Sequence, residues 1–419
     1  IWYGAWVFVE VNLFSLTGRG SHIHRDLPIF LAEMASNYQS RDVGKYLTQQ
    51  QANAPTKEIA TEWSEMEELY NKKLWHQLTV KLLSFVKNPI FAEGNALVDM
   101  YNNFLADFES RINPLSLIET MVFVLKQIKD PQESVDFLSK LEPKVKNSSE
   151  ATILCKILKG QVYLQVMKDM LLTKKHMDDI DILLNEMDGI STVHGRYYEL
   201  ASDYHRIQGN HADYYRTALR YLGCTDLESM ELQEKRDRAF YLGLAALLGE
   251  GVYNFGELLA HPILESLKED PRSWLVDLLF IFNSGDIARF EKLRKCWEVQ
   301  ADLAAKQRQL AEKISLLCLM EMTFKRPANG RQLLFEEIAS ETKLPVDEVE
   351  LLVMKALSLQ LVKGSIDQVS GKVHITWVQP RVLDKQQISV MMQRLDLWCK
   401  EIHSMEMLVE NKANDILTY

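Results

Sequence analysis

Apolar side chains return every three or four residues over most of the first three quarters of the chain. This spacing, between Glu62 and Phe324, is that of one face of a helix, and no stretch there alternates long enough with the period of two that a strand needs. Three of the runs are Leu97, Tyr101, Phe104 and Phe108; Ile118, Met121, Leu125 and Ile128; and Ile180, Leu183, Leu184 and Met187. The pattern therefore predicts a long series of amphipathic helices.

Short breaker triplets separate these helices. They are KNP at 87–89, INP at 112–114, KDP at 129–131, QGN at 208–210 and EDP at 269–271. Helices joined by tight turns favour stacked antiparallel pairs, so we expect an α-solenoid over residues 43–324, TPR-like in architecture but without a strict TPR signature. An α-solenoid presents a long curved surface, which suits binding to other proteins.

The pattern changes after Phe324. The stretch RQLLFEEIASETKL predicts a short helix whose inward positions are Leu334, Phe335, Ile338 and Ala339. Pro345 stands at the expected first position of a second helix, whose predicted buried stripe is Val349, Leu352, Val353, Ala356 and Leu357. A β-hairpin follows at 362–378, with Ser370-Gly371 as its turn and alternating Val373, Ile375 and Trp377 on the returning strand. Two helices and a hairpin predict a winged helix-turn-helix over residues 325–380.

One long helix is predicted after Pro380, in the segment 381–419. Its apolar positions form a heptad seam made of Ile388, Leu395, Ile402 and Val409 with Met391, Trp398 and Met405. Such a stripe commonly packs on its own domain. The length of the helix and its adaptable methionines favour the other possibility, a bundle with helices from other chains.

Charge changes the interpretation of the winged helix. The chain of 419 residues has 47% hydrophobic and 25% charged residues, a formal net charge of −10 and a pI of 5.6. Its predicted reading helix carries Asp347, Glu348 and Glu350 against Lys355, and the wing adds only two lysines. These carboxylates stand where the base edges and phosphates of bound DNA would lie, and they would repel it. We therefore expect a protein partner and no DNA binding.

Patterns typical of catalytic and metal sites are weak. The histidine pair in HIH at 22–24 suggests the zinc motif of ubiquitin-cleaving metalloproteases, but Ala32 and Ala35 stand where that motif needs Ser and Asp. The segment from Gly364 to Lys372 has the wrong spacing for a P-loop, and no G-x-S-x-G elbow is present. Five scattered cysteines indicate reduced thiols in the cytoplasm or nucleus. We therefore predict no enzyme, no cofactor and no metal.

The first residues differ from the rest. IWYGAWVFVEVNLFSL is apolar but is interrupted by Glu10 and Asn12, and it is too short to span a bilayer. No basic segment precedes it, so a signal peptide is a poor fit. We expect residues 1 to about 33 not to belong to the native fold, and we treat 1–42 as a separate or disordered segment.

Several stretches carry a family resemblance. RPANGRQLLFEEIA, VDEVELLVMKALSLQLVKGSIDQVSGKVHITWVQPRVLD and SMEMLVE closely resemble the PCI domain of one family of 26S proteasome lid subunits, non-ATPase regulatory subunit thirteen (nine in the yeast scheme). The resemblance also covers solenoid stretches such as GNHADYYRTALRYLGC and extends from about Val43 to Leu417. PCI subunits of the COP9 signalosome or of a translation initiation factor are the alternatives within the same class.

The resemblance implies a non-catalytic scaffold that contacts other lid subunits. Its PCI wing would dock a neighbour and its terminal helix would join a helical bundle, with the solenoid near the ubiquitin-receptor edge. An exposed strand edge and a heptad seam agree with this, since each offers groups that a partner can satisfy. The predicted interface residues are Val362, Ile366, Val373, Ile375 and Trp377 in the wing and Ile388, Met391, Leu395, Trp398, Ile402, Met405 and Val409 in the terminal helix.

Overall fold

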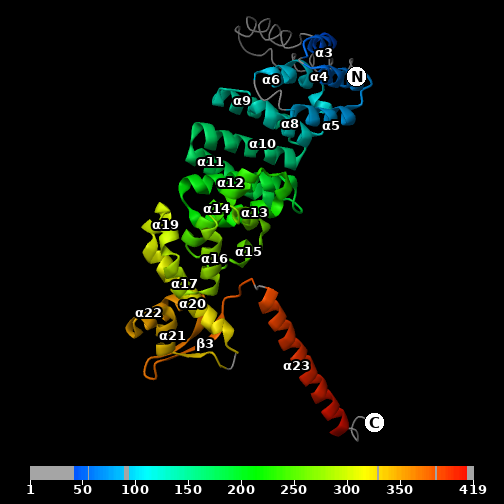
Figure 1. Cartoon of the computed structure of the whole chain (residues 1–419). Coiled ribbons are helices and arrows are strands. Elements are labelled where there is room, and N and C mark those ends of the chain that lie inside the picture. Colours follow the sequence, from blue (N-terminus) through cyan, green and yellow to red (C-terminus); the bar gives the residue numbers. More distant parts are fainter. Residues whose placement is uncertain (1–41, 55, 89–93, 328–329, 383–384, 413–419) are drawn as a thin grey trace, which may run out of the picture. The chain divides into compact units, whose positions relative to one another are not determined.

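The computed structural model describes residues 42–54, 56–88, 94–327, 330–382 and 385–412. The predictions on residues 1–33 and on the histidine pair at 22–24 lie outside these ranges. Over the described residues the chain is predominantly helical, with one small sheet near its end (Figure 1). It divides into two compact units, Ile1–Lys159 and Gly160–Tyr419.

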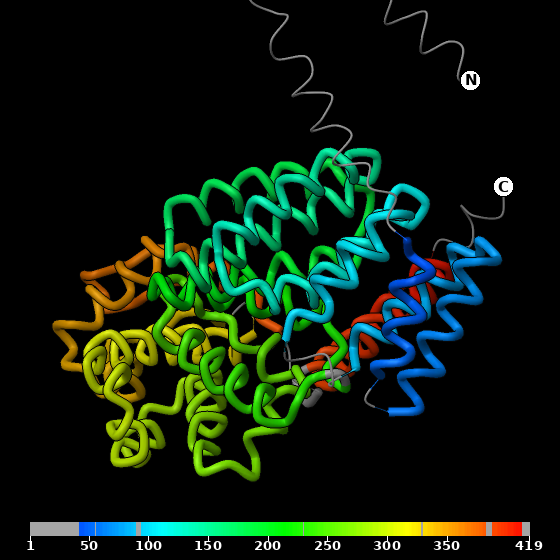
Figure 2. Tube along the Cα trace, turned by 90° about the horizontal axis from the view of Figure 1, so that it is seen from above, coloured from blue at the N-terminus to red at the C-terminus, as the bar shows by residue number. Residues whose placement is uncertain are grey.

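The first unit is built from short antiparallel helices. They are α3 (Val43–Ala52), α4 (Lys57–Asn71), α5 (Trp75–Val86), α6 (Ala96–Met100), the π-helix η2 (Tyr101–Leu105), α7 (Ala106–Phe108), η3 (Glu109–Arg111), α8 (Pro114–Leu125), α9 (Pro131–Leu141), η4 (Glu142–Lys144) and most of α10 (Ser149–Val162). α4 packs against both α3 and α5, and Figure 2 shows these three helices, in blue, side by side. The rings of Trp63 and Phe85 meet edge-on in its core, at 4.8 Å between centroids.

Predicted breakers coincide with helix ends. Asn113 and Asp130 accept hydrogen bonds from the first turns of α8 and α9, each with proline at the next position. Gly209 ends α12 (Thr192–Gln208) with a φ of 77°, and Asn210 then caps α13 (His211–Cys224). These boundaries follow from local chemistry, which is why the sequence indicates them.

The second unit continues the series of helices. Besides α12 and α13 it contains η5 (Tyr163–Met167), α11 (Met170–Asn185), η6 (Leu227–Ser229), α14 (Leu232–Leu248), α15 (Gly256–Ala260), η7 (Pro262–Leu267), α16 (Trp274–Ser284), α17 (Ile287–Lys292), α18 (Arg294–Trp297), α19 (Ala301–Ala305) and α20 (Gln307–Lys325). α12 packs on α13, α13 on α14, and both α14 and α16 on α20. One hydrophobic core extends from Tyr214 to Ile375, so the last helices of the series and the sheet are packed together.

The sheet has one strand more than predicted. Its elements are β1 (Gln332–Leu334), α21 (Phe335–Thr342), α22 (Val346–Ser358), β2 (Val362–Asp367) and β3 (Lys372–Val378). The strands are antiparallel in the order β1-β3-β2, with Leu333 opposite Val373. The prediction that Leu334 faces inward is wrong, because this residue ends β1 and is 41% exposed. A three-residue strand whose partner is far along the chain leaves no local pattern.

α22 agrees with its predicted stripe. Val349, Leu352, Val353 and Ala356 are buried, while Leu357 is half-buried. Pro345 is the N-cap, one position before the helix begins. The order β1-α21-α22-β2-β3 is the one expected of a winged helix, and α23 (Lys385–Lys412) follows it as the predicted terminal helix (Figure 1).

Candidate protein interfaces

Three predicted wing residues belong to the chain's own core. Val362, Val373 and Ile375 are each 1% exposed, so their side chains cannot touch a neighbour. The physical reason is that period-two alternation marks the apolar face of a strand, and in this sheet that face packs inward. Of the five predicted wing residues, Ile366 is half-buried and Trp377 is 37% exposed, and these two are available for contact.

The outer edge of β2 is open among the described strands. β2 is an end strand of the sheet, so the backbone groups that point away from β3 have no strand partner there. A bulge between Lys363 and Gly364 bends it, and a Cβ on Gly364 would lie 2.1 Å from the carbonyl oxygen of His374. The Lys363 ammonium covers the Trp377 ring at 5.0 Å. The edge can accept an added strand beside a half-exposed aromatic ring.

The outer face of α22 is acidic and partly apolar. The Lys355 ammonium forms an ion pair with Glu312 of α20, so this cation of α22 already has a partner. The Glu350 carboxylate accepts a hydrogen bond of 3.2 Å from Gln368. Leu351 and Met354 are 64% and 52% exposed, and they are not among the interface residues predicted from the sequence. Their spacing of three residues, off the buried stripe, was the available signal.

The seam of α23 is exposed throughout. Exposed fractions lie between 49% and 70% for the seven predicted positions, Ile388, Met391, Leu395, Trp398, Ile402, Met405 and Val409. Among the residues that the structure describes, none covers the seam. Exposed large apolar residues arranged along one helix are characteristic of a surface that another chain covers.

A segment that we call the strap, Gln379–Val382, leads from β3 toward α23. The Arg381 guanidinium forms a buried ion pair with Glu321 of α20 and donates to the Asn283 carbonyl oxygen at 3.2 Å. The Val382 N–H donates to Asn254 Oδ1 at 3.4 Å. Gly256 is required here, because a Cβ would lie 2.5 Å from the Cβ of Val382. The strap therefore fixes the exit of the winged helix against α15, α16 and α20.

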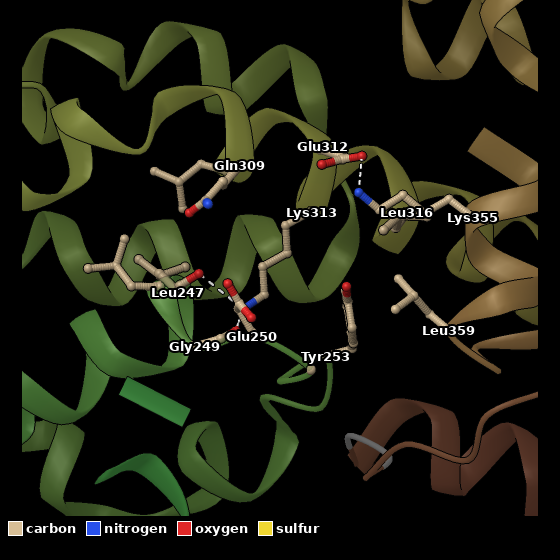
Figure 3. Close-up of a pocket in the computed structure, with 13 residues that line it drawn as sticks. Leu247, Gly249, Glu250, Tyr253, Gln309, Glu312, Lys313, Leu316, Lys355 and Leu359 are labelled. Atoms are coloured by element: carbon tan, nitrogen blue, oxygen red, sulfur yellow. Dashed lines mark hydrogen bonds and ion pairs between the residues drawn. The ribbon is translucent and has the colours of Figure 1, made fainter. Parts of the chain in front are cut away.

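A cavity of about 260 Å³ lies between α14, α20 and α22 (Figure 3). Lys313 reaches into it, and its ammonium donates to the carbonyl oxygens of Ala246, Leu247 and Gly249 at 2.8, 3.0 and 2.9 Å. Burial lowers the pKa of Lys313 to about 7. Burial, with the nearby carboxylates of Glu312 and Glu250, raises the pKa of Tyr253. Because all three donors of the ammonium are used at the end of α14, Lys313 acts as a helix cap.

Within the described part of the chain, no three His, Cys, Asp or Glu residues gather as a metal site. Among the same residues, no helix combines the length and the apolar character needed to cross a membrane.

Two family models match the chain in succession. Residues 62–279 match the model described as PSD13 N-terminal repeats, and residues 291–377 match the PCI domain. The 26S proteasome non-ATPase regulatory subunit 13 homolog B of Arabidopsis thaliana is 38% identical over 382 residues, which cover 89% of this chain and 98% of the relative.

The chain belongs to the family of 26S proteasome non-ATPase regulatory subunit 13.

Another subunit 13 relative also matches this chain over most of its length. The 26S proteasome regulatory subunit RPN9 of Saccharomyces cerevisiae is 33% identical over 372 residues, 84% of this chain and 93% of the relative. By contrast, subunit M of eukaryotic translation initiation factor 3 from Neosartorya fischeri is 27% identical over 176 residues, 41% of this chain and 37% of that protein. The likeness to the initiation factor is therefore partial, while the likeness to subunit 13 covers nearly the whole of its members.

Proposed function

We propose that this protein is a non-catalytic structural subunit of the lid of the 26S proteasome regulatory particle. In that place it supports lid assembly and, through it, the ATP-dependent degradation of ubiquitinated proteins. Full-length membership of the subunit 13 family supports this function. The observation that carries it in the structure is the uncovered seam of α23, since a scaffold that joins a helical bundle must present such a seam.

The proposal includes two separate contacts with other lid subunits. α23 enters a helical bundle through its seam, while the wing adds the open edge of β2 to a neighbour, with Ile366 and Trp377 as the contacting side chains. The helical series faces the ubiquitin-receptor subunit, and the assembled protein is found in the cytoplasm and nucleus. Lys313 caps the end of α14, and the cavity that it lines has no catalytic role in this proposal.

The seam can be tested with a pair of matched variants. Leu395→Asp with Ile402→Asp places two carboxylates on the seam, whereas Gln393→Asp with Ser404→Asp places two on the opposite side of α23. Burying an unpaired charge at a helix contact costs several kcal/mol. We expect the seam variant to enter the regulatory particle at least about tenfold less well, which corresponds to about 1.4 kcal/mol.

The measurement is the fraction of tagged chain that co-purifies with intact particles. The control pair should assemble normally, and both variants should keep the thermal unfolding midpoint of the dilute, monomeric chain, because the seam is exposed there. Normal assembly of the seam variant would refute the bundle contact.

A further inference from the structure

Four large apolar side chains are exposed together at the tip of one helical hairpin. They are Val166 at 56%, Met167 at 41%, Leu171 at 83% and Leu172 at 40%, and we call them the Leu171 patch. The first two end η5 and the other two lie in the first turn of α11. Single exposed apolar residues need no explanation, but four within seven positions concentrate exposed apolar side chains at one hairpin tip.

The backbone of this tip is irregular and well fixed. η5 is a π-helix, and Lys168 ends it in the left-handed region with a φ of 55°. Asp169 then caps α11, accepting from the N–H groups of Leu171 and Leu172 at 3.0 Å each. Tyr163 stacks on His176 at 5.1 Å and joins the two arms of the hairpin. Single π-helical turns and left-handed non-glycine residues are commonly kept where they serve a function.

The rim of the patch is basic. Lys168, Lys174 and Lys175 are exposed, and no ion pair is found for them among the described residues. The Asp169 carboxylate is directed to the backbone of α11, while Asp178 and Asp179 follow the lysines one helical turn farther from Leu171. The chain as a whole has a net charge of −10, so three exposed lysines next to the patch differ from its acidic average.

We propose that the Leu171 patch docks a segment of a neighbouring protein that places large apolar side chains beside Asp or Glu. The apolar residues supply the buried centre of the contact and the three lysines its complementary rim. The inference rests on the proposed function, because it assigns a third contact surface to a lid subunit and states the chemistry of that partner.

A protein segment fits the patch better than a lipid surface does. A helix that lies on a membrane turns its whole apolar face to the lipid. α11 instead buries its apolar face within its own unit, through Met177, Ile180 and Leu184, and presents only its first turn.

The test uses a photo-crosslinking amino acid at Leu171 of the full chain within purified regulatory particles, followed by sequencing of the crosslinked peptides. We expect one major crosslink, to a partner segment with at least two acidic residues close to the crosslinked position. Lys174→Glu with Lys175→Glu should lower the crosslink yield about tenfold at low salt, and the difference should shrink at high salt. The matched control is the same probe at Ile182, which is 60% exposed on α11 and has Asp178 and Asp179 nearby; it should give no major crosslink.

Each other outcome is decisive. Particles that contain the chain but give no crosslink at Leu171, a partner segment without acidic residues, or an unchanged yield in the lysine variant would overturn this inference alone. Binding of the free chain to phosphatidylserine vesicles that the lysine variant abolishes would assign the patch to lipid and overturn it too. Absence of the chain from the particles would overturn the proposed function and this inference together.

Discussion

Individual buried polar groups stabilise the region where the helical series meets the winged helix. Lys313 is 7% exposed and sits at the carbonyl end of α14. Its surroundings have opposite effects, because burial disfavours the ammonium while three carbonyl oxygens at the negative end of a helix favour it. Burial is the cause of the lowered pKa, which is about 7. This residue therefore links stability to pH.

Stability should rise with pH above neutrality because of Lys313. The unfolded chain keeps this lysine protonated up to its ordinary pKa of 10.5, while the folded chain releases the proton near pH 7. The unfolded state binds more protons in between, so the free energy of unfolding should increase by up to about 1.4 kcal/mol per pH unit. The measurement is urea unfolding at several values between pH 7 and 10, compared with Lys313→Met, which lacks this contribution.

Arg308→Met, on an exposed position of the same helix, is the control and should follow the unaltered chain at every pH. If the difference between the chain and Lys313→Met stays constant over this range, the three carbonyl contacts keep the ammonium charged, and the expected link to pH is absent.

At the scale of elements, local and distant contacts differ in how well the sequence reveals them. The starts of α8, α9 and α13 were predictable because Asn113, Asp130 and Asn210 act within three residues of their own position. β1 and the strap were not, since Leu333 pairs with Val373 and Arg381 pairs with Glu321. The π-helical turns η2 and η5 also left no signal, because their apolar spacing is close to that of an ordinary helix.

Removing the strap's ion pair should destabilise the second unit. Arg381→Ala leaves the Glu321 carboxylate, whose side chain is 10% exposed, with only the more distant Lys325 at 3.7 Å. Loss of one partner of a buried pair costs about 3 kcal/mol. Urea unfolding should show this decrease, and Glu321→Gln in the same chain should recover part of it.

The control for the strap is Arg294→Ala, which removes the ion pair between Arg294 and Glu298. These two side chains are 52% and 39% exposed, respectively. Exposed pairs contribute below about 1 kcal/mol. Equal effects of the two arginine substitutions would show that the strap is held by its other contacts.

At the scale of the whole molecule, the sequence indicated the architecture and the family but not which apolar surfaces are free. The PCI stretches and the helical series predicted a subunit 13 relative, which the comparisons confirm. The seam of α23 was equally compatible with packing on its own domain, because an amphipathic helix has the same pattern whichever chain covers it. Likewise, the sequence indicated the alternation of Val373 and Ile375 but not that this face turns inward.

The isolated chain should associate with itself through α23. Its exposed seam has no partner in solution, so sedimentation velocity should show species larger than a monomer that increase with concentration. Deleting residues 385–419 should give a monomer with the thermal unfolding midpoint of the full chain at low concentration, since the seam side chains are exposed among the described residues. A full-length chain that remains monomeric at high concentration would contradict this expectation.

Because one face of the hairpin is buried, its residues need different treatment in mutational scanning. Shortening Val362, Val373 or Ile375 to alanine removes methyl groups from the interior, so a loss of incorporation after such a change would report misfolding. Trp377 is partly exposed, so its side chain can be changed while the buried residues of the hairpin stay in place. Mapping of contacts on the hairpin should therefore begin with its exposed residues. Each variant at a buried residue needs a test of protease resistance to show that it still folds.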